Sequence, residues 1–130
     1  MDILRVRSTE REQMVEFTDQ VRQKLKDLGA SEGLCVLYVR HTTAGLTVNE
    51  NADPDVQRDM LLALRKLVPQ YGMGFLHGEE NSDAHVKASL MGPTLTVPFH
   101  DGELLLGRWQ GIYLCDFDGP RERQVVMMIR

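Results

Sequence analysis

Four short apolar runs separated by turn residues make up residues 95–129, LTVPFHDGELLLGRWQGIYLCDFDGPRERQVVMMI. The runs are Leu95–Phe99, Leu104–Leu106, Gly111–Leu114 and Val125–Ile129. Apolar runs of this length between turn residues are typical of β-strands. His100-Asp101-Gly102 is a hairpin-turn signal between the first two runs, and Asp118-Gly119-Pro120 marks a turn before the last. This third of the chain therefore predicts antiparallel β-sheet.

Earlier parts of the chain add strands and a helix. Three further strand-like runs are Ile3–Arg7, Leu34–Val39 and Leu46–Val48. Beyond them, Asp53 is suited to cap a helix and Pro54 to occupy its first position. Apolar residues then recur every three or four positions, at Val56, Met60, Leu64 and Leu67. This spacing predicts an amphipathic helix that ends at Pro69.

The start of an earlier helix has two interpretations. Thr9-Glu10-Arg11-Glu12 matches a capping box, which would begin the helix at residue 10. Alternatively, Gln13–Phe17 is a strand, and Thr18 caps a shorter helix through Leu28. Gly29 ends the helix in both cases. The whole pattern predicts an α+β fold, mostly antiparallel β-sheet with a sandwich-like core and two helices, in one domain over residues 1–130.

The composition is that of an ordinary globular domain. Hydrophobic residues make up 42% and charged residues 26% of the 130 residues. A net charge of −4 argues against nucleic-acid binding, because phosphate contacts need clustered Lys and Arg. No apolar stretch approaches the ~20 residues of a membrane span, and no secretory leader is visible. Cys35 and Cys115 form no Cys-x-x-Cys pair, so we expect a cytoplasmic protein with no membrane or nucleic-acid partner.

The histidines are the strongest candidates for chemistry. His41 follows a predicted strand, whereas His77 and His85 flank the polar segment 78–84. Three imidazoles around one cation, with an open fourth position, are the general plan of a catalytic zinc site. The alternative for each is a structural, hydrogen-bonded ring, and for His100, at a turn tip, this alternative is the better interpretation.

Two further polar clusters could contribute to a site. In the segment 49–53, Glu50 is as well suited to orient a ligand as to form a turn, whereas Asn51 and Asp53 favour turn and capping roles. Trp109, the only tryptophan, is either a core anchor or the wall of a pocket in which Gln110 supplies an amide. Arg108 is suited to hold a phosphate or to remain a solvated surface residue.

Three motifs resemble the YjbQ family, whose members are often labelled secondary thiamine-phosphate synthase. The first is His41–Asn51, the second runs from His77 through Asn81 to Leu90, and the third joins Leu106–Ile112 to Asp116–Arg121. The resemblance covers residues 3–129. It implies a compact α+β homotrimer with a strand at Gln13–Phe17, and a cleft in which three histidines gather around a metal ion or an anion.

The resemblance also implies an activity, the weak formation of thiamine phosphate from a pyrimidine diphosphate and a thiazole phosphate as a side activity. We expect His41, His77 and His85 to hold a metal; Glu50, His41 and His85 to take part in catalysis; and Asn49, Asn81, Arg108, Trp109 and Gln110 to contact the substrate. Imidazole ligands favour a zinc-like divalent ion, with Mg²⁺ as the other candidate. Arg108 stands where the family usually has threonine. The alternative function is a non-catalytic trimeric protein that binds a small phosphorylated or anionic ligand.

Overall fold

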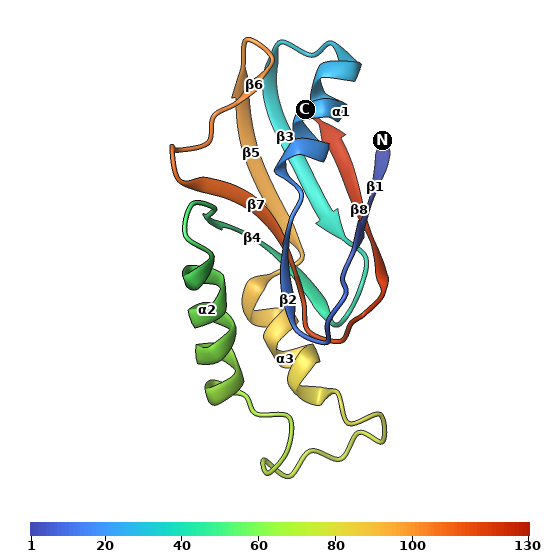
Figure 1. Ribbon diagram of the computed structural model, residues 1–130. Helices are drawn as coiled ribbons and strands as arrows, with labels where there is room; N and C mark the ends of the chain where they lie inside the picture. Colours follow the sequence, from blue (N-terminus) through green and yellow to red (C-terminus); the bar gives the residue numbers. More distant parts are fainter.

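Two antiparallel sheets form the body of the protein. The computed structural model describes residues 1–130 and contains eight strands and three helices (Figure 1). The five-stranded sheet has the order β1 (Asp2–Arg7), β8 (Glu122–Ile129), β3 (Glu32–Val39), β5 (Thr94–His100) and β6 (Glu103–Leu104). The three-stranded sheet has the order β2 (Gln13–Glu16), β7 (Gln110–Asp116) and β4 (Ala44–Glu50). The antiparallel sheets of the expected α+β fold are thus confirmed.

The core lies between the two sheets and beneath one helix. Helix α1 (Thr18–Leu28) buries Val21 and Leu25 against inward-facing residues of both sheets. Along β5 the buried residues alternate with exposed ones, as expected for a sheet with a single covered face. Helix α2 (Pro54–Leu67) and helix α3 (Ser82–Met91) lie together at the other end of the molecule (Figure 1). They pack on a second, smaller apolar cluster around Tyr113 and Phe117.

The two turns expected in the C-terminal third are present but differ in role. Asp101 and Gly102 adopt positive φ values of 52° and 75° and connect β5 to β6 as a hairpin. The turn at residues 118–120 instead carries the chain from the three-stranded sheet into the five-stranded one, because β7 and β8 belong to different sheets. The strand expected over Leu104–Leu106 is shorter, since Leu105 and Leu106 lie beyond the end of β6.

The shorter of the two early helices is the correct one. A strand occupies Gln13–Glu16 and α1 begins at Thr18. Phe17, however, holds the N-cap position, while the Thr18 hydroxyl donates to Glu16 and accepts from the Ile112 backbone N–H. Gly29 ends the helix in the left-handed conformation, with φ 66°. At α2, the Asp53 side chain accepts a hydrogen bond from Asp55 N at 2.9 Å, which confirms the expected cap.

The expectation of two helices was wrong, because α3 is a third. It carries no apolar stripe, and the residues it buries are Asp83, Ala84, Lys87 and Ala88. The charged members of that face are paired with each other, Lys87 Nζ lying 2.8 Å from Asp83 Oδ2. A helix held by small and ion-paired residues escapes a search for hydrophobic periodicity. No helix of the protein combines the length and the hydropathy needed to cross a bilayer.

Candidate functional site

His41 and His85 face one pocket of about 330 Å³. His41 belongs to the connection between β3 and β4, and His85 to the first half of α3. Thr42, Ala44, Ala88, Ser89 and Pro93 complete the lining. Gly45, the next residue of β4, explains how α3 comes so close, since a Cβ there would lie 2.7 Å from the Met91 side chain. The close packing of α3 on β4 therefore brings two histidines from distant segments together.

His77 joins this pair through His85. The two rings have centroids 5.8 Å apart and planes at 81°, an edge-to-face contact. His77 lies in the exposed segment between α2 and α3, where its Nε2 is 3.9 Å from Glu79 Oε2. The three histidines of the sequence motifs thus lie in a row, with His85 between His41 and His77.

The His41 ring is already fixed by a backbone hydrogen bond. Gln124 N donates to His41 Nε2 at 2.9 Å, so the neutral ring carries its proton on Nδ1. Burial lowers the pKa of His41, and the positive charge of Arg123 lowers it further. His41 is therefore a neutral imidazole near pH 7, whose free N–H can donate to a ligand.

The histidine types fit a zinc-like ion, but their arrangement within one chain does not. No group of three His, Cys, Asp or Glu side chains converges in a metal-ligating arrangement. His41 Nε2 is also taken by the Gln124 hydrogen bond.

A buried ion pair lies behind His41. Arg123 is 1% exposed and donates to both Asp116 oxygens, from Nη2 at 2.6 Å and from Nε at 3.0 Å, and to Thr43 Oγ1 at 2.9 Å. Ser8 Oγ donates to Asp116 Oδ2 at 2.6 Å. Burial raises the pKa of the Asp116 carboxyl, but the hydrogen bonds from Arg123 and Ser8 outweigh it and hold the pKa below its usual value. Within this pair, the positive charge of Arg123 lowers the pKa of His41 and the negative charge of Asp116 partly opposes it.

A second buried network fixes α3. Lys87 Nζ lies 2.8 Å from Asp83 Oδ2 and 3.1 Å from Glu12 Oε2, and Arg11 Nη2 lies 2.9 Å from Asp83 Oδ1. Burial raises the pKa of Asp83, yet hydrogen bonds from Arg11 and Lys87 leave it lowered overall. Because these bonds tie the helix to the segment before β2, they also set the position of His85. Sequence reasoning missed this network, although Asp83 and Lys87 have the four-residue spacing of a helical ion pair.

Asn81, expected to contact substrate, is instead enclosed at the start of α3. It is 6% exposed, and its Nδ2 donates to Asp118 Oδ2 at 2.8 Å. Its Oδ1 has no hydrogen-bond partner within the protein. Asn81 therefore has one acceptor still available for a water molecule or a donor group.

The remaining expected site residues lie at the opposite end of the same strands. Glu50 pairs with Gln110 in the β4–β7 register, whereas Ala44 pairs with Asp116 beside the histidines. Six residue steps at about 3.3 Å each separate the two ends by roughly 20 Å. The structure thus divides the expected residues into a histidine group and a Glu50–Trp109 group.

Most members of the second group serve the local backbone. Asn49 Oδ1 accepts from Glu50 N at 2.7 Å, Glu50 Oε2 accepts from Asp53 N at 3.3 Å, and Gln110 Oε1 accepts from Gly107 N at 2.7 Å. Trp109 differs from them. It is 53% exposed, which rules out a core anchor, and the Arg108 guanidinium stacks 4.8 Å from the centre of its ring.

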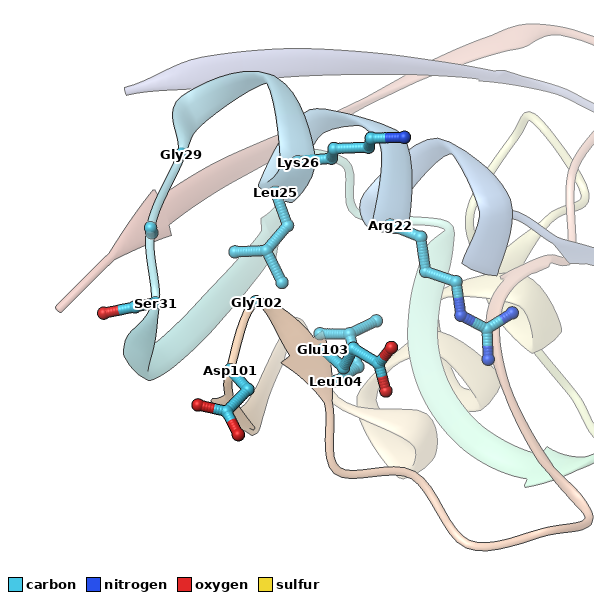
Figure 2. Close-up of a pocket in the computed structure, with 10 residues that line it drawn as sticks. Arg22, Leu25, Lys26, Gly29, Ser31, Asp101, Gly102, Glu103 and Leu104 are labelled. Carbon is cyan, nitrogen blue, oxygen red and sulfur yellow. The ribbon is translucent and has the colours of Figure 1, made fainter.

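A second cavity, of about 850 Å³, contains none of these residues. It lies between the C-terminal half of α1 and the β5–β6 turn (Figure 2). Leu25 and Leu104 supply apolar surface, Arg22 and Lys26 lie on the helix side, and Asp101 and Glu103 lie on the hairpin side. Its opposite charges do not select a phosphorylated ligand, so the histidine pocket is the better candidate.

Comparison with known proteins places the whole chain in one group. The family profile described as "UPF0047 protein YjbQ-like" matches residues 2–130. UPF0047 protein MJ1081 of Methanocaldococcus jannaschii is 44% identical over 124 residues, 95% of this chain and 89% of that protein. UPF0047 protein YugU of Bacillus subtilis is 44% identical over 120 residues, 92% of this chain and 91% of that protein.

Solved structures agree with this grouping. A Clostridium acetobutylicum protein of the YjbQ/UPF0047 family superposes with a TM-score of 0.96 at 44% identity, covering 100% of both chains. A YbjQ-like protein of unknown function from Sulfolobus solfataricus superposes with a TM-score of 0.92 at 30% identity, covering 98% of this chain and 94% of that one. The fold described above is therefore the fold of the relatives.

Proposed function

The chain belongs to the UPF0047 YjbQ-like family, and on that basis we propose that it is a homotrimeric transferase acting on a small phosphorylated molecule at the His41–His85 pocket. The proposed reaction is of the thiamine-phosphate synthase type, joining a pyrimidine diphosphate to a thiazole phosphate. One observation carries the proposal: His41 and His85, from separate sequence motifs, line the same pocket, and His77 contacts His85.

The two pocket histidines have different parts in this proposal. Because His41 is neutral and uses Nε2 as an acceptor, its Nδ1–H donates to a phosphate oxygen without needing protonation. His85 is not fixed by a side-chain hydrogen bond of this kind, and histidine is the side chain that most often acts as a general acid or base. We therefore assign ligand binding to His41 and proton transfer to the departing diphosphate to His85.

A divalent ion is a separate part of the proposal. Imidazole nitrogens favour a zinc-like ion over Mg²⁺, although the three histidines form no ligand set within one chain. Elemental analysis of purified protein tests it directly. A stoichiometric ion that His85→Ala loses would support the ion, whereas metal content near zero in the unaltered protein would contradict it.

The activity is tested with the purified protein and the two proposed substrates, by following thiamine phosphate. We expect His85→Ala to lower turnover by about 100-fold or more, the usual effect of removing a general acid. His100→Ala is the matched control, because His100 lies on an exposed hairpin and bonds only to Glu32 and Asp101. Equal turnover by the two variants would contradict the proposed role of the pocket.

The second candidate function is a binding protein that does not turn its ligand over. The open pocket and the neutral His41 donor favour it, because neither requires chemistry. It predicts that inorganic pyrophosphate raises the melting temperature both with and without chelator, and that thiamine phosphate does not form. Stabilisation that disappears with chelator would contradict it.

The proposed self-association is supported by an uncovered apolar sheet face. The outward residues of the five-stranded sheet include Ile3, Leu34, Val36, Tyr38, Val126 and Met128, and Ile3, Leu34 and Tyr38 are more than 40% exposed. The register places Ile3 beside Val126 and Val126 beside Tyr38. Contiguous apolar surface of this kind marks protein contacts. Sedimentation velocity should give three times the chain mass.

The proposed location is the cytoplasm, because its reducing conditions suit the two free, buried thiols.

A further inference from the structure

The cavity between α1 and the β5–β6 hairpin takes no part in the proposed function. Its volume of about 850 Å³ is within the roughly 300–1,000 Å³ range of small-molecule sites. Its apolar floor is Leu25, which is buried in the main core cluster, and Leu104, which packs against that cluster. The hydrogen bond from Gly102 N to Ser31 O, at 2.9 Å, ties the hairpin to the segment that follows α1. The two walls of the cavity are therefore held in a fixed relation.

The charged residues of the two walls have opposite signs. Arg22 and Lys26 lie one helical turn apart on α1, whereas Asp101 and Glu103 lie on the hairpin (Figure 2). No ion pair joins the two walls. The cavity thus keeps positive and negative side chains apart, with apolar surface between the elements that carry them.

Arg22 and Glu103 are the charges most available to a ligand. Glu103 forms no ion pair, because the nearby His100 is paired with Glu32 and Asp101 instead. Arg22 pairs only with Asp19, whose side chain is 98% exposed, and a solvated pair of this kind is worth little. Figure 2 shows Arg22 and Glu103 extending to the same side of the cavity, one from the helix and the other from the hairpin.

This lining selects a ligand that carries both charges. A simple anion that binds Arg22 would be repelled by the hairpin carboxylates, and a simple cation that binds Glu103 would be repelled by Arg22 and Lys26. An α-amino acid carries an ammonium and a carboxylate on the same carbon, and its side chain is free to cover an apolar floor. Guanidinium groups bind carboxylates well, because their N–H donors match the two oxygens.

We propose that this cavity binds a free α-amino acid with a large apolar side chain. Its carboxylate binds Arg22, its ammonium binds Glu103, and its side chain packs on Leu25 and Leu104. Lys26 adds positive charge on the carboxylate side. The site is separate from the histidine pocket, with which it shares no residue, so it does not depend on the proposed reaction.

The first measurement is an NMR titration of the ¹⁵N-labelled protein with L-phenylalanine. We expect saturable shifts of the Gly29 and Gly102 amides, which line the cavity, and none at Ala44 or Ser89 in the histidine pocket. L-alanine should bind about 10-fold more weakly or worse, because it buries less apolar surface. No saturable shift at Gly29 and Gly102 with millimolar phenylalanine would overturn the proposal.

The second measurement pairs altered ligands with altered residues. Phenylalaninamide lacks the carboxylate and N-acetylphenylalanine lacks the ammonium, so each should bind the unaltered protein about 10-fold more weakly or worse. Arg22→Gln should abolish the preference for phenylalanine over the amide and keep the preference over the acetyl compound. Glu103→Gln should do the reverse. Arg58→Gln, on the exposed face of α2, is the matched control and should keep both preferences.

Two results would overturn the proposal. One is that both preferences are the same in Arg22→Gln, Glu103→Gln and the control, because the two charges would then not contact the ligand. The other is that these variants change the mass of the protein in sedimentation velocity while phenylalanine shifts no cavity amide, because the cavity would then be a contact between chains. Neither result depends on whether the protein makes thiamine phosphate.

Discussion

Replacing Arg123 with methionine should destabilise the protein strongly at neutral pH and much less in acid. Arg123 is 1% exposed and Asp116 is 0% exposed, so the substitution leaves a buried carboxylate without its counter-charge. Removing one member of a buried ion pair costs about 3–5 kcal/mol in the free energy of unfolding. Methionine is chosen because it keeps most of the side-chain volume, so the loss reports on charge rather than on a cavity.

The pH dependence of that loss follows from Asp116. Its pKa is lowered in the native protein, so the stability it contributes is present above the unfolded-state value and is lost as pH falls below it. Without Arg123 the burial that raises this pKa is opposed only by the hydrogen bonds from Ser8 Oγ and Asp118 N, and protonation relieves the stranded charge at a higher pH. The difference between variant and native protein should therefore shrink as pH falls from 7 towards about 4.

The assay is urea unfolding followed by circular dichroism at several pH values. Arg5→Met is the matched control, because Arg5 is exposed on β1 and lies 4.0 Å from Glu122. Its effect should stay within about 0.5 kcal/mol at every pH. If Arg123→Met cost no more than Arg5→Met at pH 7, or the same amount at all pH values, the assigned role of the ion pair would be refuted.

Three other outcomes are expected. The His41 ring should titrate by NMR below its ordinary pKa of 6.5. Because a lowered imidazole pKa makes the folded protein less stable as pH falls below 6.5, His41→Gln should reduce this pH-dependent loss of stability. A ring that titrates at or above 6.5 would contradict this. Leu64→Ala should lower the free energy of unfolding by about half of the roughly 2–5 kcal/mol lost at a fully buried leucine, because Leu64 is half-buried on the second cluster. Leu67→Ala, at an exposed position, should change it very little in the same urea titration. Asp53→Ala should cost about 1 kcal/mol through the lost cap, and a value equal to that of the exposed, non-capping Asp59→Ala would show that the cap adds nothing.

The sequence predicted most strands and the start of α2. The apolar runs became strands, apart from Leu105 and Leu106, and the cap and proline at residues 53 and 54 began α2 as expected, although α2 buries none of its residues fully and leaves Leu67 exposed. Helix α3 was missed because its buried face contains Asp83 and Lys87, which become compatible with a core only when paired with residues far away in sequence. Such pairing depends on tertiary contacts that no local pattern records.

The structure brings some of the expected site residues together and separates others. The contact between His77 and His85 and the shared pocket of His41 and His85 follow the motifs. The roughly 20 Å separation of Glu50 and Trp109 from them could not be predicted, because it depends on the β4–β7 register. The exposure of Trp109 also opposed the commoner interpretation of a lone tryptophan as a core anchor.

The position of β8 between β1 and β3 constrains when this protein can fold on the ribosome. β1 pairs with β8 alone, so the first strand to be synthesised has no partner until residues 122–129 leave the exit tunnel. A nascent chain that stops short of β8 exposes unpaired edges on both β1 and β3, the kind of surface that aggregates or recruits chaperones. The five-stranded sheet is therefore completed only once synthesis has passed the last strand, and nonsense mutations in that segment should leave no folded remnant.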